Sequence, residues 1–334
     1  MVGSRVVALP TGGQGRQVST DYCNPVYDHY FADPFVMEAP ASGSRYVAVG
    51  TGTVPDDRVF EVLVSDDLVH WRSVGGALER PEGCGSDFWA PEVAEHEGRW
   101  WMYYSCGEGD VGHSLRVAVA DDPTGPYVDQ GVDLTPDERF AIDPHPFRDE
   151  DGTWYLYYAR DVLEGERVGT MLAVDRLDGM TRLAGEPQTV LTPSADWQIF
   201  LRQREMYGRT YDWHTLEGPF VRRRDGRYWC FYSGGSYLEP SYGVGVAVAD
   251  APLGPWSAPA DAGPILRTVP ERVVGPGHNS VVTSPSGTDV IVYHAWDAAQ
   301  TARRMCVDPL VWSPDGPTVD GPTWEPTDLE RTSG

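Results

Sequence analysis

Short apolar segments separated by turn residues run along most of the chain, and helical periodicity is nearly absent. The segments are rich in Val, Tyr, Trp and Phe, and Gly, Pro or Asp bounds them, which is typical of β-strands. Five strands form a matching set at residues 46–50, 100–105, 154–158, 228–233 and 290–294. Four of the five directly follow turns such as Asp-Gly and Ser-Gly, which predicts that each closes a hairpin.

The strands repeat in a fixed order along the chain. One strand precedes each member of this set and another follows it, and the segments 117–127 and 246–256 have nearly the same sequence. The units begin near residues 33, 91, 143, 217 and 278. A self-similar unit of about 50 residues with several antiparallel strands is typical of a propeller blade. We therefore predict an all-β fold, a five-bladed β-propeller with the active site at one mouth of its central channel.

The repeat also predicts the domain organisation. The propeller spans residues 24–323, with an N-terminal extension at 1–23 and a C-terminal tail at 324–334. The third unit is longer than the others, and the excess falls at residues 181–214. We interpret this excess as a long loop on one face of the propeller, where functional residues are common.

Equivalent positions on the first strands of the five units carry polar residues. The first strand of each blade lines the channel, so these positions should converge at one mouth of the channel. They hold Asp33, Ala90, Asp143, Glu217 (one residue early) and His278. Each Asp-Pro alone is ordinary turn chemistry, and a single histidine is often only a polar core residue. Three carboxylates brought together, however, carry a desolvation and repulsion cost that indicates a function.

Clustered carboxyl groups with different pKa values are what glycoside hydrolysis requires. One group must stay protonated to protonate the leaving oxygen, and another must stay ionised to activate water or attack the sugar. Aromatic side chains beside the second inner strand could stack on a sugar ring, and we predict that Trp89 and Phe88 do so, although core packing is the alternative.

The composition excludes several other classes of protein. Asp and Glu number 50 against 26 Lys and Arg, all of them arginine, so the net charge of −24 argues against nucleic-acid and membrane partners. The five cysteines are odd in number and have no CxxC spacing, so neither a disulfide framework nor a zinc site is predicted. The N-terminus has no apolar run before a cleavage site, which predicts a cytoplasmic protein. A chain trimmed of a leader would instead be secreted.

Five motifs in order resemble those of glycoside hydrolase family 43, over nearly the whole chain. They are FADP at 31–34, DFWAPEV at 87–93, AIDP at 141–144, EGPFV at 217–221 and GPGHNSVV at 275–282. The resemblance implies that Asp33 is the general base, Glu217 the general acid and Asp143 the residue that tunes the pKa of the acid. It also implies that Trp89, Phe88, Ala90 and His278 contact the substrate, and that an arginine of the last unit does so, which is Arg303 with Arg304 as the alternative.

The resemblance implies no required cofactor, although in related arabinanases the histidine matching His278 helps to hold a hydrated cation, often calcium, in the channel. One histidine does not make a calcium site, because calcium prefers six to eight oxygen ligands. The implied substrates are oligosaccharides or polysaccharides that contain arabinofuranose or xylose.

Several activities remain open within and outside this family. The expected activity is that of an inverting, exo-acting α-L-arabinofuranosidase on arabinan-type oligosaccharides. The alternatives are an endo-1,5-α-L-arabinanase or a β-xylosidase. Outside catalysis, a propeller that only binds sugars would be expected to lack Asp33 or Glu217, and a protein-interaction propeller would need no converging carboxylates.

Overall fold

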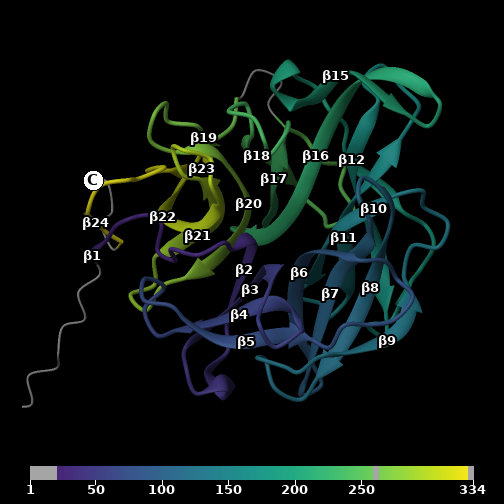
Figure 1. Cartoon of the computed structure of the whole chain (residues 1–334). Helices are drawn as coiled ribbons and strands as arrows, with labels where there is room; N and C mark the ends of the chain where they lie inside the picture. The colour runs from purple at the N-terminus through teal and green to yellow at the C-terminus, as the bar shows by residue number, and fades with distance from the viewer. Residues whose placement is uncertain (1–20, 259–262, 330–334) are drawn as a thin grey trace, which may run out of the picture.

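Five blades of antiparallel strands arranged around one centre make up the fold, in a computed structural model that describes residues 21–258 and 263–329 (Figure 1). Within these residues, the inner strands β2, β6, β10, β16 and β20 contact one another in a closed ring. Each ring member is the innermost strand of its blade, and the next strands follow outward in chain order. This is the five-bladed propeller that the repeat predicts.

The blades share one strand order and differ mainly in length. The first comprises β2 (Ala32–Glu38), β3 (Tyr46–Thr53), β4 (Val59–Ser65) and β5 (Arg72–Leu78). The second comprises β6 (Asp87–His96), β7 (Arg99–Glu108), β8 (Val111–Ala120) and β9 (Val128–Asp133). The third comprises β10 (Ala141–Arg148), β11 (Trp154–Val162), β12 (Gly169–Asp178) and β14 (Gln188–Leu191), with β13 (Arg182–Leu183) paired to β12. The fourth comprises β16 (Arg209–Arg224), β17 (Arg227–Gly234), β18 (Gly243–Ala249) and β19 (Leu266–Arg267), and the fifth β20 (Val274–Thr283), β21 (Asp289–Trp296), β22 (Arg303–Ser313) and β23 (Gly316–Val319).

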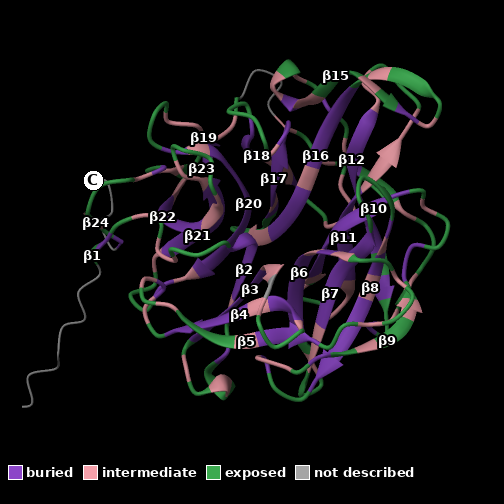
Figure 2. Cartoon of the chain, in the orientation of Figure 1, coloured by how far each residue is buried: buried purple, intermediate pink, exposed green. Residues whose placement is uncertain are grey.

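The hydrophobic core lies between the blades. The second strands contribute many of the fully buried aromatic residues, which pack against the neighbouring sheets, and they include Tyr46, Tyr103, Tyr104, Tyr157, Tyr158, Phe231 and Tyr293. Figure 2 shows the burial concentrated in the strands and the exposure in the turns that join them. Burial of these large side chains on both faces of each sheet explains the apolar, poorly alternating sequence of the second strands.

The interpretation of residues 181–214 as a long loop was wrong. Besides β13 and β14, the segment forms a short 3-10 helix, η2 (Asp196–Gln198), strand β15 (Ile199–Met206) and the first part of β16. A two-residue turn at Tyr207–Gly208, with both residues at positive φ, closes the β15–β16 hairpin. The first part of β16 also pairs in parallel with β12, so the third and fourth blades join into one ten-stranded sheet. The extra residues therefore form an ordered wall of strands, because their backbone groups pair with one another and with β12.

The two ends of the described chain meet beside the fifth blade. Strand β1 (Asp21–Tyr22) pairs with β24 (Thr327–Asp328), both outside the predicted propeller boundaries. Tyr22 donates a hydrogen bond to Asp308 of β22 at 2.7 Å, and this contact ties the paired ends to the fifth blade. A second 3-10 helix, η1 (Pro40–Ser42), lies between β2 and β3. The five cysteines are free, and no helix among the described residues is long and apolar enough to cross a membrane.

Candidate active site

Each inner strand carries one residue in the left-handed backbone region, at the same place in the repeat. These residues are Asp33, Ala90, Asp143, Gly218 and His278, with φ between 47° and 59°. At each of them the pairing with the second strand shifts register, as at a β-bulge. The bulge re-aims the side chain toward the channel, and four non-glycine residues accept the unfavourable φ. Such strain, repeated around one channel mouth, is typical of a functional site.

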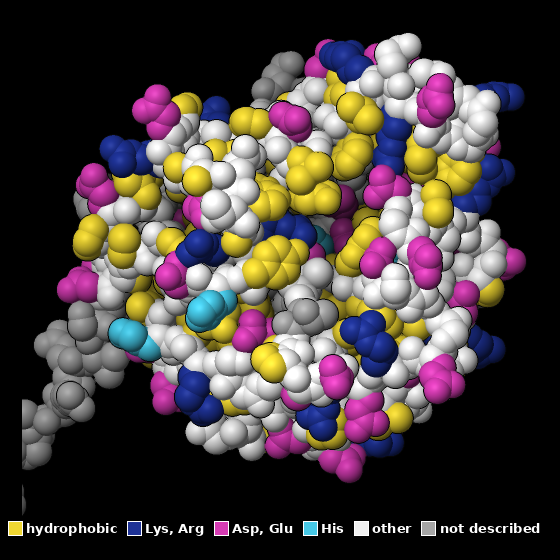
Figure 3. Space-filling view, in the orientation of Figure 1, with side chains coloured by type: hydrophobic (Ala, Val, Ile, Leu, Met, Phe, Trp, Pro, Cys, Tyr) yellow, Lys and Arg dark blue, Asp and Glu magenta, His cyan; other side chains and the backbone are white. Residues whose placement is uncertain are grey.

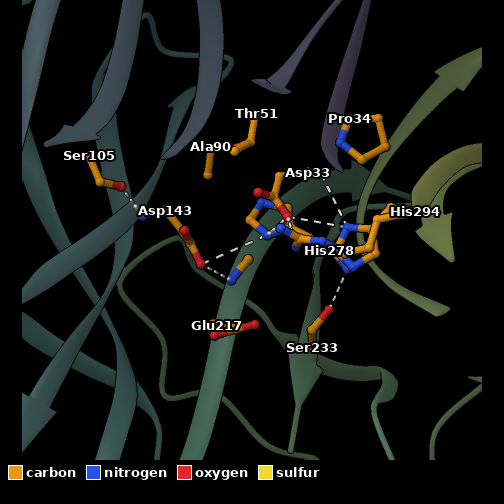
Figure 4. Close-up of polar contacts among 12 residues, drawn as sticks. Asp33, Pro34, Thr51, Ala90, Ser105, Asp143, Glu217, Ser233, His278 and His294 are labelled. Carbon is orange, nitrogen blue, oxygen red and sulfur yellow. Dashed lines mark hydrogen bonds and ion pairs between the residues drawn. The ribbon is translucent and has the colours of Figure 1, made fainter. Parts of the chain in front are cut away.

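Three carboxyl groups and one imidazole meet at this mouth. Figure 4 shows Asp33, Asp143, Glu217 and His278 pointing toward one another. His278 Nδ1 lies 3.4 Å from Asp33 Oδ1 and 3.9 Å from Asp143 Oδ2. Glu217 precedes the left-handed Gly218, which explains why its position in the repeat is one residue early. Glycine avoids crowding there, because a Cβ on Gly218 would lie 3.1 Å from the His278 ring.

Asp33 is buried among groups that favour its ionised form. Burial opposes ionisation, but the Arg303 guanidinium, followed by His278, outweighs it and holds the pKa of Asp33 well below its usual range. Arg303 donates to Asp33 Oδ1 at 3.2 Å, and His294 Nδ1 lies at 3.2 Å from the same oxygen. Burial lowers the pKa of His294 to about 4, so this imidazole is neutral at pH 7. Asp33 is therefore a carboxylate near neutral pH.

The surroundings of Glu217 favour its protonated form. Burial raises the pKa of Glu217 to about 7, because the effects of Tyr242 and Arg303, which lower it, are smaller. The Tyr242 hydroxyl donates to Glu217 Oε1 at 2.6 Å. Burial, reinforced by the charges of Glu217 and Asp33, also raises the pKa of Asp143 well above its usual range. One ionised and one protonated carboxyl group thus face the same site, the two states that acid–base cleavage of a glycosidic bond requires.

The carboxyl groups lie in a cavity of about 340 Å³ whose lining includes Asp33, Asp143, Glu217, His278, Trp89 and Arg303. This volume is at the small end of the range of about 300–1,000 Å³ for ligand pockets. Figure 3 shows the hollow near the middle of the propeller face, with hydrophobic and arginine side chains at its edge. A second cleft adjoins the cavity and shares Tyr30, Thr51 and Trp89 with it.

Comparison with known proteins gives the same indication as this geometry. Residues 22–318 match the model of glycosyl hydrolases family 43. The chain belongs to this family. Family 43 members are glycoside hydrolases, and this protein is therefore a glycoside hydrolase.

The similar family 43 proteins differ in the sugars that their names record. The chain is 29% identical, over 88% of its length and 83% of the relative, to a β-D-galactofuranosidase of Aspergillus niger. It is 26% identical to an extracellular exo-α-(1→5)-L-arabinofuranosidase of Streptomyces avermitilis, over 91% of this chain and 65% of the relative. A solved thermostable family-43 glycoside hydrolase is 33% identical, with a TM-score of 0.81 over 93% of this chain and 99% of the other.

Two of the residues predicted to contact the substrate in this family 43 site do not line the cavity with the carboxyl groups. Successive side chains of β6 point to opposite faces, so Phe88 packs into the core against Phe60 and Tyr104, while Trp89 faces the cavity. Phe88 borders only the adjoining cleft. Ala90 is also buried, and its side chain is absent from the cavity wall. Trp89, His278 and Arg303 line the cavity, whereas Arg304 pairs with Asp28 and Asp297.

The described side chains around His278 form no site that would coordinate calcium directly. The described part of the chain holds no group of three or more His, Cys, Asp or Glu residues arranged to bind a metal ion. The Nδ1 atom of His278 faces Asp33 and Asp143 instead, and calcium prefers six to eight oxygens. We therefore assign no step of the chemistry to a metal, and we do not identify His278 as a metal ligand.

The sequence did not reveal several residues of the cavity wall. Tyr237 and Tyr30 flank Arg303, which places its guanidinium 4.7 Å and 5.7 Å from their ring centres. His113 stacks behind Trp89 with ring centres 3.7 Å apart. These residues lie in turns and outer strands, and only the repeat alignment of the inner strands was informative about position. The wall contributed by Phe200, Arg204, Met206 and Trp213 comes from the β15–β16 hairpin.

Proposed function

We propose that this protein is an inverting, exo-acting α-L-arabinofuranosidase that acts on arabinan-type oligosaccharides. The observation that carries the proposal is the contrast between Asp33, kept ionised, and Glu217, with its pKa raised to about 7, at one cavity of a family 43 fold. At pH values between these two pKa values, Asp33 is ionised and Glu217 is protonated, as the base and the acid must be. Activity should therefore fall as the pH rises through about 7 and Glu217 loses its proton.

Asp33 is the proposed general base. Its carboxylate takes a proton from a water molecule as the water oxygen attacks the anomeric carbon. Arg303 holds the carboxylate through Oδ1 and opposes its protonation, so the group remains a base in slightly acidic solution. Because Asp33 and Glu217 belong to the first and fourth blades, they approach the sugar from non-adjacent strands, which favours room for a water between them.

Glu217 is the proposed general acid. It gives its proton to the glycosidic oxygen as the bond from that oxygen to the anomeric carbon breaks, which releases the leaving alcohol and leaves Glu217 ionised. Tyr242 donates to Glu217 Oε1, and this hydrogen bond stabilises the carboxylate that forms. Asp143 is proposed to tune the acid, since its charge and that of Glu217 each disfavour ionisation of the other.

The preference for a furanoside rests on the relatives. Several of the similar curated proteins are named as furanosidases, and they include the A. niger and S. avermitilis enzymes and an exo-α-(1→5)-L-arabinofuranosidase of Streptomyces chartreusis that is 29% identical over 87% of both chains. Two relatives named as a putative β-xylosidase and a β-xylosidase match 94% and 60% of this chain, so a β-xyloside stays an alternative substrate. The galactofuranosidase makes a β-D-galactofuranoside the second candidate substrate.

The test is a panel of nitrophenyl α-L-arabinofuranoside, β-D-xyloside and β-D-galactofuranoside, followed by proton NMR of the preferred reaction before mutarotation. We expect the arabinofuranoside to have the highest kcat/KM and the first-formed sugar to have inverted anomeric configuration. An initial product with the configuration of the substrate would rule out the single displacement, and a faster xyloside would overturn the substrate class.

The exo mode of action is proposed from the closure of one side of the cavity. Arg204 of β15 donates to Asp110 in the β7–β8 turn at 2.6 Å and lies over the rings of Phe200 and Trp213. This contact bridges the second blade and the β15–β16 hairpin, and all four residues line the cavity. A polysaccharide could not continue through that wall, so only a terminal sugar would fit.

We expect Arg204→Ala to open this wall. The variant should release short oligosaccharides as well as arabinose from linear arabinan at early times, whereas the parent releases arabinose alone. Chromatography of the products measures this. Arg182→Ala is the matched control, because Arg182 forms an exposed ion pair with Asp178 away from the cavity. Arabinose as the single early product of both variants would show that the Arg204–Asp110 bridge does not set the mode of attack.

A further inference from the structure

Four of the five blades form the same hydrogen bond to the preceding blade, and the fourth blade in the chain lacks it. In four blades, the backbone N–H of the left-handed residue donates to a side chain on the second strand of the preceding blade. These bonds run from Ala90 to Thr51 Oγ1 (2.8 Å), Asp143 to Ser105 Oγ (3.1 Å), His278 to Ser233 Oγ (2.7 Å) and Asp33 to His294 Nδ1 (3.1 Å). Figure 4 shows these acceptors around the carboxyl groups.

The acceptors occupy equivalent positions in their strands. Within each blade, the acceptor on the second strand pairs with the inner-strand residue that directly precedes the left-handed residue. The pairs are Ala32 with Thr51, Trp89 with Ser105, Glu217 with Ser233, and Gly277 with His294. In the third blade the corresponding pair is Ile142 with Ala159. Ala159 is fully buried and has no side-chain acceptor. The N–H group that should point to this position is that of Gly218.

The Gly218 N–H donates instead to Asp143 Oδ2, at 2.9 Å. Asp143 and Glu217 thus meet where the repeated bond is missing, and Gly218 directly follows Glu217 in β16. A buried backbone N–H needs an acceptor, and a hydroxyl at position 159 would compete for this one. The one position of the repeat without a side-chain acceptor, Ala159, therefore corresponds to the N–H group that binds Asp143 next to Glu217.

We propose that Ala159 is a positioning residue: its lack of an acceptor leaves the Gly218 N–H to Asp143 and so holds the Asp143 carboxylate beside Glu217. The proposal rests on the roles proposed above for Asp143 and Glu217. A hydrogen bond from an N–H favours the ionised form of a carboxyl group, so this bond lowers the pKa of Asp143 against the burial and the neighbouring charges that raise it, and it favours Glu217 as the member of the pair that keeps a proton. The absence of the bond between the third and fourth blades thus helps to keep Glu217 protonated as the general acid.

Other charged and titratable groups face this pair from every side. They are Asp33 of β2, Glu92 of β6, Tyr242 before β18, His278 of β20 and Arg303 of β22. A substitution at position 159 leaves all of them in place. A shift in the pH profile of such a variant would therefore report on the Gly218 N–H.

The test is the pH profile of kcat/KM in Ala159→Ser, with Ala159→Gly as its matched control. Serine already occupies the equivalent buried position in the second and fourth blades, at Ser105 and Ser233. In Ala159→Ser the N–H is divided between two acceptors, so Asp143 binds a proton more readily and Glu217 loses its proton at lower pH. We expect the basic limb to move to lower pH by about half a unit to one unit, the scale of one hydrogen bond, and kcat/KM at pH 7 to fall about two- to fivefold.

The control separates this effect from simple packing. Ala159→Gly also lacks an acceptor, so its basic limb should stay where the parent has it, although its melting temperature should fall. In an Asp143→Ala background, Ala159→Ser should no longer move the limb. Equal profiles for the serine and glycine variants would overturn the proposal. If Ala159→Ser does not fold, Ala159→Thr supplies the same hydroxyl, as Thr51 does in the first blade.

The outcome can be separated from a failure of the proposed function. If Glu217→Gln keeps the parental turnover, the assignment of the acid is wrong. If Glu217→Gln is inactive while the profiles of Ala159→Ser and Ala159→Gly coincide, the acid assignment stands and the inference about Ala159 alone fails.

Discussion

Glu217→Gln should lose about 10²–10⁴-fold in kcat on substrates with poor leaving groups, such as oligosaccharides. The amide cannot give a proton to the departing oxygen, but it keeps the size and polarity of the side chain. The basic limb near pH 7 should disappear at the same time, because the group whose pKa burial raises to about 7 is gone. Steady-state kinetics across pH on an arabino-oligosaccharide measure both effects.

The leaving group supplies the control for this prediction. A dinitrophenyl arabinofuranoside needs little protonation of its leaving oxygen, so Glu217→Gln should lose much less activity on it than on the oligosaccharide. A loss of equal size on both substrates would show that Glu217 acts in some way other than as the acid. An unchanged melting temperature is expected, because a neutral amide relieves the cost of a buried carboxyl group.

Asp33→Asn should lose about 10²–10⁴-fold in kcat whatever the leaving group, because the base acts on the attacking water. This substitution leaves the Arg303 guanidinium, which Asp33 now neutralises, without its carboxylate partner. Kinetics on the same oligosaccharide and dinitrophenyl substrates distinguish the two roles, since only Glu217→Gln should recover with a better leaving group.

Stability must be measured alongside Asp33→Asn. Removing one partner of a buried ion pair destabilises a protein by about 3–5 kcal/mol, so a lower melting temperature is expected. A matched control is Asp289→Asn, which also removes a buried carboxylate paired with arginines, Arg222 and Arg224, but far along β21 from the cavity. It should lower stability and leave kcat unchanged. If Asp33→Asn loses no more activity than Asp289→Asn, Asp33 is not the base.

The fold could be predicted from the sequence because each blade repeats the same pattern of turn residues and strands. The turn residues, the apolar second strands and the Asp-Pro or equivalent dipeptides recur together, and strand pairing within a blade depends mainly on neighbours in the chain. Residues 181–214 were misread for the opposite reason. Their strands are stabilised by pairing with β12 and by the wall around the cavity, and no repeat partner in the sequence marks them.

Only the site residues at repeated positions of the inner strands could be predicted from the sequence. The inner-strand positions placed Asp33, Asp143, Glu217 and His278 together, as Figure 4 shows. Aligning the second strands in the same way would also have singled out Ala159, because Thr51, Ser105, Ser233 and His294 are all polar at that point. Phe88 lies outside the cavity with the carboxyl groups, because the alternation of side chains along β6 puts neighbouring residues on opposite faces.

By itself, the sequence determined the number of blades, the inner strands and which polar residues meet at the channel mouth, since all of these follow from periodicity. Only the tertiary structure decided the charge states and the shape of the cavity. Whether Asp33 is ionised and Glu217 protonated depends on burial, on Tyr242 of the fourth blade, and on Arg303 and the histidines of the fifth blade. The wall that Arg204 and Asp110 close joins segments 94 residues apart. Such contacts between distant segments leave no period in the sequence, because they are set by how the blades pack around the channel.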